Sequence, residues 1–167
     1  YNDVGTDVRV LDAELGQIEI DWDRIEKIEF TATPSKMEEK FGEPLYGTVE
    51  RDDGEFTGFV KWDHDERVSP DKLDGKTEDG DVSISFGKIT SIERYSSSRS
   101  IVVLKSGREL TLRGSNDVNS ENRGVIVTVA GMGRVDIPWD DFNKVTFANP
   151  PSSGPSYAEF ASQSKLK

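Results

Sequence analysis

The chain has 167 residues, and 32 Asp and Glu against 21 Lys and Arg give it a formal net charge of −11. This acidic balance argues against a nucleic-acid partner, because binding to a phosphate backbone draws on clustered Lys and Arg. The chain contains no cysteine, which excludes disulfides and thiolate catalysis. No apolar run approaches the roughly 18–20 residues of a membrane span, and the first residues lack the charged-then-apolar pattern of a signal peptide.

One sequence pattern, hereafter the motif, occurs three times: apolar-x-apolar-x-aromatic-x-x-apolar-x-x-apolar, without a gap. Its copies cover residues 18–28, 82–92 and 135–145, with Trp22, Phe86 and Trp139 at the aromatic position. Internal repetition of alternating apolar residues predicts an all-β repeat protein. Because the same position carries an aromatic side chain each time, we expect all three to lie in the core.

The strand signals are short and closely spaced. Strands are expected at 8–11, 17–21 and 27–30, and hairpin turns at Asp53-Gly54 and Ser106-Gly107. Such strands usually curl into a small barrel or a sandwich. The sequence therefore predicts an all-β protein of tandem, related small-barrel or sandwich units of short bent strands, with at most one short helix.

Five segments follow from this pattern. They are a partial β unit (1–33), a connector with a candidate short helix (34–46), a β unit with a long acidic loop (47–95), a second β unit (96–148) and a Pro/Ser/Gly-rich linker and tail (149–167). The tail resembles the lead-in to the unit that starts at Gly47. One interpretation is a longer array of such units; the other is that the first half unit pairs with the tail.

The connection from residue 63 to residue 81 holds eight acids against three basic residues. Ca²⁺ takes six to eight oxygen ligands from such loops, which makes these acids candidate metal ligands: Asp63, Asp65, Glu66, Asp79 and Asp81. Their spacing matches neither the EF-hand nor the glycine-rich nonapeptide repeat. A solvated acidic loop is the simpler interpretation, and no cofactor besides this candidate calcium is expected.

Two residues beside this connection are candidates for ligand binding. His64 is the only histidine, and between Asp63 and Asp65 it suits a ligand or general-base role. No serine, however, stands in a nucleophile-elbow context. Trp62 ends a predicted strand, either as a stacking platform for a sugar or peptide or as a core residue on the strand's apolar face. A surface histidine and a core tryptophan are the simpler interpretations.

Residues 133–147 read Gly-x-Val-x-Ile-Pro-Trp-x-x-Phe-x-x-Val-x-Phe. Together with residues 47–63, this stretch resembles β-rich repeat proteins from bacterial genomes, and it is similar in style to Sm-like and SH3-like small barrels. The resemblance covers most of residues 5–148, and its motifs are structural. It implies a fold style and a bacterial origin but no site residue. The net charge of −11 departs from the RNA-binding members of the barrel group.

These observations favour a non-catalytic binding or scaffolding module of unknown ligand, part of a larger bacterial repeat protein. The first alternative is a calcium-stabilised carbohydrate- or peptide-binding module that uses the acidic connection and Trp62. The second is a hydrolase built on acid pairs with His64. Expected partners are a protein or carbohydrate ligand, with no nucleic acid, and self-association through exposed sheet edges. A bacterial envelope or secreted location is favoured over the cytoplasm.

Overall fold

A computed structural model describes residues 8–32 and 41–151 of the chain. The chain divides into two compact units, Tyr1–Phe41 (the N-terminal unit) and Gly42–Lys167 (the C-terminal unit). All described strand pairs are antiparallel, and the described helices are three short 3-10 helices. The all-β prediction is therefore confirmed. The candidate short helix of the connector, expected at residues 34–41, lies outside the described residues except for Phe41, and the tail beyond residue 151 lies wholly outside them. No helix in the described ranges is long and apolar enough to cross a membrane.

The N-terminal unit contains a hairpin of β1 (Val8–Asp12) and β2 (Gly16–Ile20). The Asp12 side chain shapes its turn, accepting the backbone N–H groups of Glu14 and Leu15 at 2.8 and 2.9 Å. The 3-10 helix η1 (Trp22–Arg24) follows. Residues 25–32 then form no strand with any described residue, so the strand expected at 27–30 has no ladder partner there.

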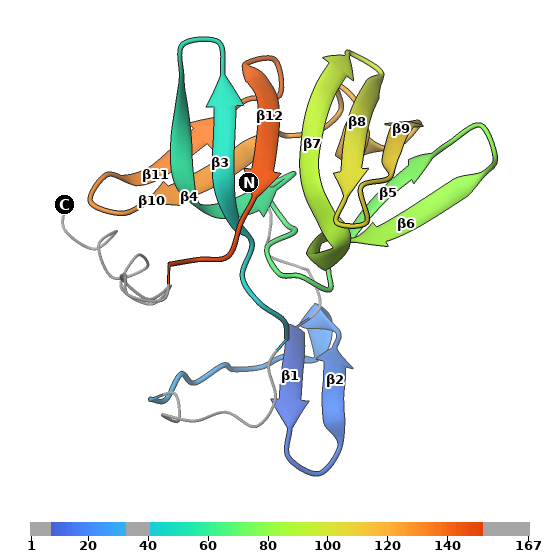
Figure 1. Cartoon of the computed structure of the whole chain (residues 1–167). Helices are drawn as coiled ribbons and strands as arrows, with labels where there is room; N and C mark the ends of the chain where they lie inside the picture. The colour runs from blue at the N-terminus through green and yellow to red at the C-terminus, as the bar shows by residue number, and fades with distance from the viewer. Residues whose placement is uncertain (1–7, 33–40, 152–167) are drawn as a thin grey trace. The chain divides into compact units, whose positions relative to one another are not determined.

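In the C-terminal unit, ten strands form one sheet in the order β11-β10-β4-β3-β12-β7-β8-β9-β5-β6 (Figure 1). The strands are β3 (Tyr46–Arg51), β4 (Gly54–Trp62), β5 (Lys72–Lys76), β6 (Asp81–Ser85), β7 (Ile89–Ser96), β8 (Arg99–Leu104), β9 (Glu109–Arg113), β10 (Val125–Val129), β11 (Gly133–Ile137) and β12 (Phe142–Phe147). Two 3-10 helices, η2 (Phe86–Lys88) and η3 (Asn116–Val118), lie between them.

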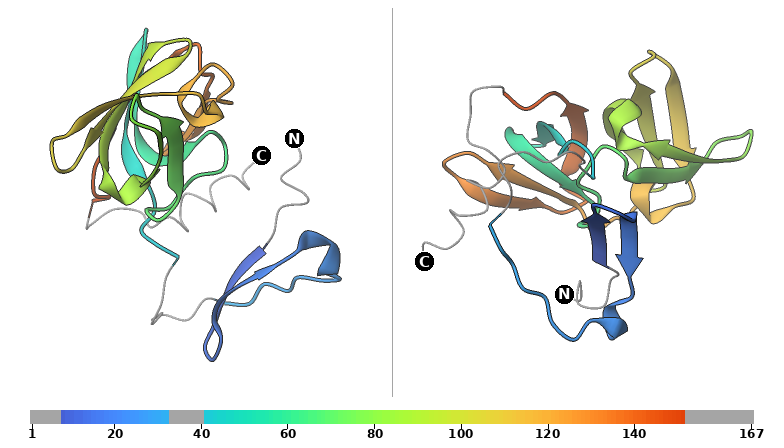
Figure 2. Two further views of the ribbon diagram at one scale, coloured as in Figure 1. Left: turned by 90° about the vertical axis from the view of Figure 1, so that its right-hand side faces the viewer. Right: turned by 90° about the horizontal axis from the view of Figure 1, so that it is seen from below.

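This sheet is open: no pairing among residues 41–151 joins its outer strands β11 and β6 into a closed barrel. It is strongly bent instead. In Figure 1, β10 and β11 run in a different direction from β3 and β12, and β5 and β6 diverge from β7 and β8; Figure 2 shows the same two groups from other sides. Both predicted hairpin turns, at Asp53-Gly54 and Ser106-Gly107, are present between β3 and β4 and between β8 and β9.

The three motif copies have the same local backbone. In each, the carbonyl of the aromatic residue accepts the N–H of the apolar residue three positions later. The pairs are Ile25 to Trp22 at 3.1 Å, Ile89 to Phe86, and Phe142 to Trp139 at 3.2 Å. The hairpins before the first and third copies also share their register, since Val8 pairs with Ile20 as Val125 pairs with Ile137.

The order of strands in the sheet differs from their order along the chain. Hairpin β3–β4 lies between β12, which contains the end of the third motif copy, and β10, which precedes that copy. Hairpin β8–β9 lies between β7, which contains the end of the second copy, and β5, which precedes it. The segments expected as separate units, 47–95 and 96–148, therefore exchange their hairpins. Each half of the sheet is built from both segments, which joins the two halves into one intertwined body.

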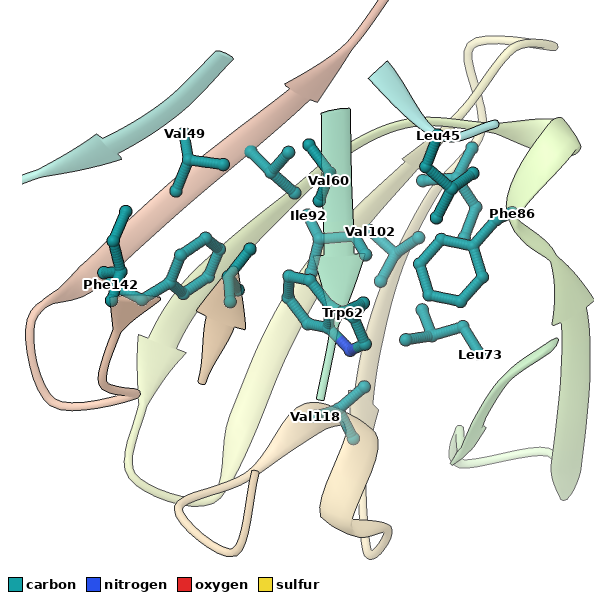
Figure 3. Packing of buried hydrophobic residues seen from close by; sticks show 14 of the residues in the cluster. Leu45, Val49, Val60, Trp62, Leu73, Phe86, Ile92, Val102, Val118 and Phe142 are labelled. Atoms are coloured by element: carbon teal, nitrogen blue, oxygen red, sulfur yellow. The ribbon is translucent and has the colours of Figure 1, made fainter. Parts of the chain in front are cut away.

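Trp62 lies at the centre of the core, fully buried at the end of β4 (Figure 3). Its ring packs edge-to-face on Trp139 and Phe142, at centroid distances of 5.9 and 5.2 Å, and lies 6.3 Å from Phe86. The predicted core position is thus confirmed for Phe86 and Trp139. For Trp22 it is wrong in the described structure, where 39% of the side chain is exposed.

Gly58 lies where β4 closely approaches its neighbour β10. A Cβ added there would lie 2.2 Å from the carbonyl oxygen of Thr128 on β10, so any side chain would force β4 and β10 apart. The glycine is therefore needed for close approach of the two backbones, as is typical of glycines inside strands.

Candidate functional site

The acidic turn, Trp62–Glu66, reverses the chain after β4. The backbone N–H of Trp62 donates to the Glu66 carbonyl at 2.8 Å, and the Glu66 N–H donates to the Trp62 carbonyl at 3.0 Å. Asp63 and His64 have positive φ angles of 44° and 67°, a region that costs energy for residues with a side chain. The surrounding contacts must therefore hold the turn in this shape.

Asp63 supplies those contacts. Its side chain is 1% exposed. Oδ1 accepts the backbone N–H of Arg123 at 2.6 Å and its Nε–H at 3.3 Å, while Oδ2 accepts the Asn116 amide at 2.6 Å. Hydrogen bonds to an ionised acceptor are stronger than neutral ones. The carboxylate thus fastens the turn to the segment that leads from η3 into β10, and both of its oxygens are already used.

Two neighbouring carboxyl groups have raised pKa values. Burial, with the charges of Asp65 and Asp117, raises the pKa of Glu66 to about 9, and its Oε2 is buried with no hydrogen-bond partner among the described residues. Burial also raises the pKa of Asp117 to about 6, although its carboxylate accepts the Asp74 N–H at 2.7 Å. Near neutral pH, Glu66 is therefore an uncharged acid. Perturbed carboxyl groups of this kind occur both at active sites and in structural clusters.

His64 lies against β11. Its Nε2 is 3.2 Å from Oδ1 of Asp136, whose Oδ2 accepts a hydrogen bond from Arg134, also at 3.2 Å. Among the described residues its hydrogen-bond partner is thus a surface carboxylate. This arrangement orients the imidazole but supplies no nucleophile for it to activate.

The structure divides the predicted metal ligands between two places. Asp63, Asp65 and Glu66 lie in the acidic turn, where Asp65 also pairs with Arg123 at 2.7 Å. Asp79 and Asp81 lie in the β5–β6 hairpin, where Asp81 faces Lys76 at 3.5 Å. Within residues 8–32 and 41–151, no group of three or more His, Cys, Asp or Glu is placed to hold a metal ion.

The acidic connection is not the single long loop that the sequence suggested. It contains β5, where buried Leu73 and Gly75 alternate with exposed Lys72, Asp74 and Lys76. This alternation is a strand signal, but the glycine and the dense charges conceal it.

Trp62 offers no stacking face at the surface, because its ring is enclosed and its Nε1–H donates to the Asp117 carbonyl at 3.0 Å.

A cavity of about 480 Å³, here called the Leu45 cavity, lies beside the start of β3. Its apolar lining includes Leu45, Tyr46, Phe86, Ile89, Phe147 and Ala148, and its polar lining includes Glu43, Ser69, Lys105 and Asn149. Cavities of this size with an apolar lining and a few polar groups are typical of ligand sites. It is lined by none of the acidic-turn residues.

Sequence reasoning missed this cavity because its walls come from segments far apart in the chain. Phe86 belongs to the second motif copy, Phe147 follows the third at the end of β12, and Lys105 lies in the turn after β8. The exchange of hairpins brings these segments together, and no local motif signals it. Comparison of the chain with protein-family models, with curated proteins and with solved structures found no match.

Proposed function

We propose that the protein is a non-catalytic binding and scaffolding module that holds its ligand in the Leu45 cavity. The preformed cavity carries this proposal. Three of its apolar residues, Leu45, Phe86 and Ile89, are at most 5% exposed and belong to the core. A ligand there would contact the partly exposed Tyr46 and Phe147 beside these buried residues, and a rigid wall lowers the entropy cost of binding.

The hydrogen bonds of the acidic turn support a non-catalytic role. Asp63 is already hydrogen-bonded to Asn116 and Arg123, and His64 is hydrogen-bonded to Asp136. A general base needs a reacting group within hydrogen-bond reach. The two alternatives, a calcium-stabilised module and a hydrolase, both rely on these same side chains.

The cavity chemistry favours a peptide ligand. An apolar floor suits a buried side chain, and the Lys105 ammonium at the wall suits a carbonyl or carboxylate. A sugar that stacks on Tyr46 is the other ligand class. The repeated motif and the exchanged hairpins support a scaffolding role in a larger bacterial repeat protein.

The test is a selection of ligands from a random peptide library and a glycan array, with the full chain as bait. Each selected ligand is then measured against Ala148→Trp, which fills the cavity, and against Ala130→Trp, the same change at an exposed turn between β10 and β11. We expect Ala148→Trp to weaken binding at least about tenfold, or 1.4 kcal/mol, and Ala130→Trp to leave it unchanged. Ligands that bind Ala148→Trp normally would refute the cavity as the site.

A further inference from the structure

The segment after η1 exposes apolar side chains and joins no sheet among the described residues. Ile28 is 44% exposed and Phe30 is 93% exposed, and residues 25–32 pair with no described strand. An apolar segment whose backbone lies outside any ladder is a template for pairing with another chain.

The C-terminal unit shows what the same motif position does when it is paired. Counting from the aromatic residue, Ile28 corresponds to Ile92 of the second copy and Val145 of the third. Ile92 and Val145 are both fully buried and pair with each other in the antiparallel ladder of β7 and β12. Two motif copies thus meet at the middle of the sheet through their equivalent residues.

The residues beside this pair carry complementary charges. Lys144 pairs with Glu93 in the β7–β12 ladder, and its Nζ lies 3.3 Å from a Glu93 carboxylate oxygen. In the first motif copy, Lys27 stands at the position of Lys144 and Glu29 at the position of Glu93. The first copy therefore carries both halves of this ion pair on one strand.

We propose that two copies of this chain pair through residues 27–29, antiparallel and centred on Ile28, a partner assignment that rests on the scaffolding role proposed above. In this register Ile28 faces Ile28 of the second copy, as Ile92 faces Val145. Lys27 of each copy faces Glu29 of the other, so the Lys144–Glu93 pairing occurs twice. In a single copy these two side chains contact each other; in the dimer they exchange partners.

A second copy fits this position better than a hairpin of the kind that covers the other motif copies. Among residues 41–151, hairpins β3–β4 and β8–β9 already have strands on both sides. The alternation of Lys27 and Glu29 about Ile28 is also self-complementary, which a two-fold interface requires because the same patch serves both subunits.

The first experiment uses the absence of cysteine from the chain. In the proposed register the two Cα atoms at position 28 are about 4.5–5.5 Å apart, within the range of a disulfide. Ile28→Cys should give a disulfide-linked dimer under mild oxidation. In Glu26→Cys, the matched control, the two sulfur-bearing positions are offset by roughly 14 Å along the strands, so it should stay unlinked. Equal linking of both variants, or of neither, overturns the register.

The second experiment is sedimentation equilibrium of the full chain over a range of concentrations. Lys27→Glu and Glu29→Lys each place like charges opposite one another twice, and should weaken the dimer between about fivefold and thirtyfold. The double variant K27E/E29K restores both pairs and should recover the wild-type dissociation constant. Arg108→Glu, an exposed change with the same effect on net charge as Lys27→Glu, is the control. A monomeric wild type, or a double variant as weak as the single ones, overturns the proposal.

The outcome is independent of the cavity. Ligand binding that responds to Ala148→Trp in a monomeric protein would keep the binding role and refute the dimer. A dimer that dissociates on charge reversal, in a protein for which no cavity ligand is found, would support the dimer and refute the binding role of the cavity.

Discussion

Asp63 and Arg123 are separated by 60 residues in the chain, yet one carboxylate oxygen of Asp63 accepts both the backbone N–H and the Nε–H of Arg123. This relationship joins the end of β4 to the start of β10. It also explains how the acidic turn keeps two consecutive residues at positive φ. The charge at this position is therefore a structural element of the C-terminal unit.

Asp63→Asn should lower the free energy of unfolding by about 2–3 kcal/mol, because an amide nitrogen cannot accept the hydrogen bonds that the carboxylate receives. The measurement is urea unfolding followed by circular dichroism. Asp65→Asn is the matched control: Asp65 also contacts Arg123, but its side chain is 60% exposed, so the loss should stay below about 1 kcal/mol. Equal effects of the two changes would contradict the anchoring role.

Trp62→Ala should cost about 3–5 kcal/mol, since it removes a fully buried indole that packs against three aromatic rings. Trp22→Ala changes a residue of the same type that is 39% exposed. At protein concentrations below the dissociation constant of the proposed dimer, it should lower the free energy of unfolding by less than about 1 kcal/mol. Both values come from chemical denaturation. A small effect at Trp62 would show that the ring is not the centre of the core.

Glu66 should make stability depend on pH in a direction opposite to most acids. The unfolded chain loses this proton near the ordinary pKa of 4.5, and the folded protein near 9. Between these values unfolding releases a proton, so the free energy of unfolding falls as pH rises. The stability that the neutral carboxyl provides is fully present below about pH 4.5 and is lost by about pH 9.

Glu66→Gln should therefore be more stable than the wild type at pH 8 by at least about 1 kcal/mol and similar to it at pH 4. Asp117 acts in the same direction over a narrower window, from 3.8 to about 6. Thermal unfolding across pH 4 to 9 tests both. Glu78→Gln, at an exposed hairpin tip, is the control. A difference between Glu66→Gln and the wild type that does not change with pH would refute the buried neutral acid.

Excess CaCl₂ and EDTA should give the same melting temperature at equal ionic strength. The physical reason is local: both oxygens of Asp63 already accept hydrogen bonds, and Asp65 is paired with Arg123. Binding to a site filled at 100 times its Kd would add about 2.7 kcal/mol of stability. A calcium-specific rise of several degrees would therefore restore the calcium-stabilised module as the better function.

The sequence predicted the parts of this fold that depend on local pattern. Alternating apolar residues located β1 and β2, and Asp53-Gly54 and Ser106-Gly107 located two hairpin turns, because positive φ at a turn has a clear residue signature. The aromatic position of the motif correctly indicated the core for Phe86 and Trp139. These features are set within a few residues of the chain.

The parts that were missed depend on contacts between distant segments. Strand β5 was hidden by its charges, because only Leu73 and Gly75 face inward. The exchange of hairpins leaves no local trace, since β3 would present the same apolar face to either motif copy. For the same reason the Leu45 cavity, which the exchange creates, had no sequence signal. The acids of residues 63–66 were expected as metal ligands, and the hydrogen bonds that Asp63 accepts from Asn116 and Arg123 were not predicted.

The exchanged hairpins also set an order of events during synthesis. Hairpin β8–β9 emerges from the ribosome just after β5–β7, so that half of the sheet can assemble at once. Hairpin β3–β4, with Trp62 at its end, must wait for β10–β12, which end at Phe147. At about 5–20 residues per second this delay is on the order of 4–17 s. A nascent chain stalled after β9 has emerged would hold a completed half beside an apolar hairpin open to chaperones.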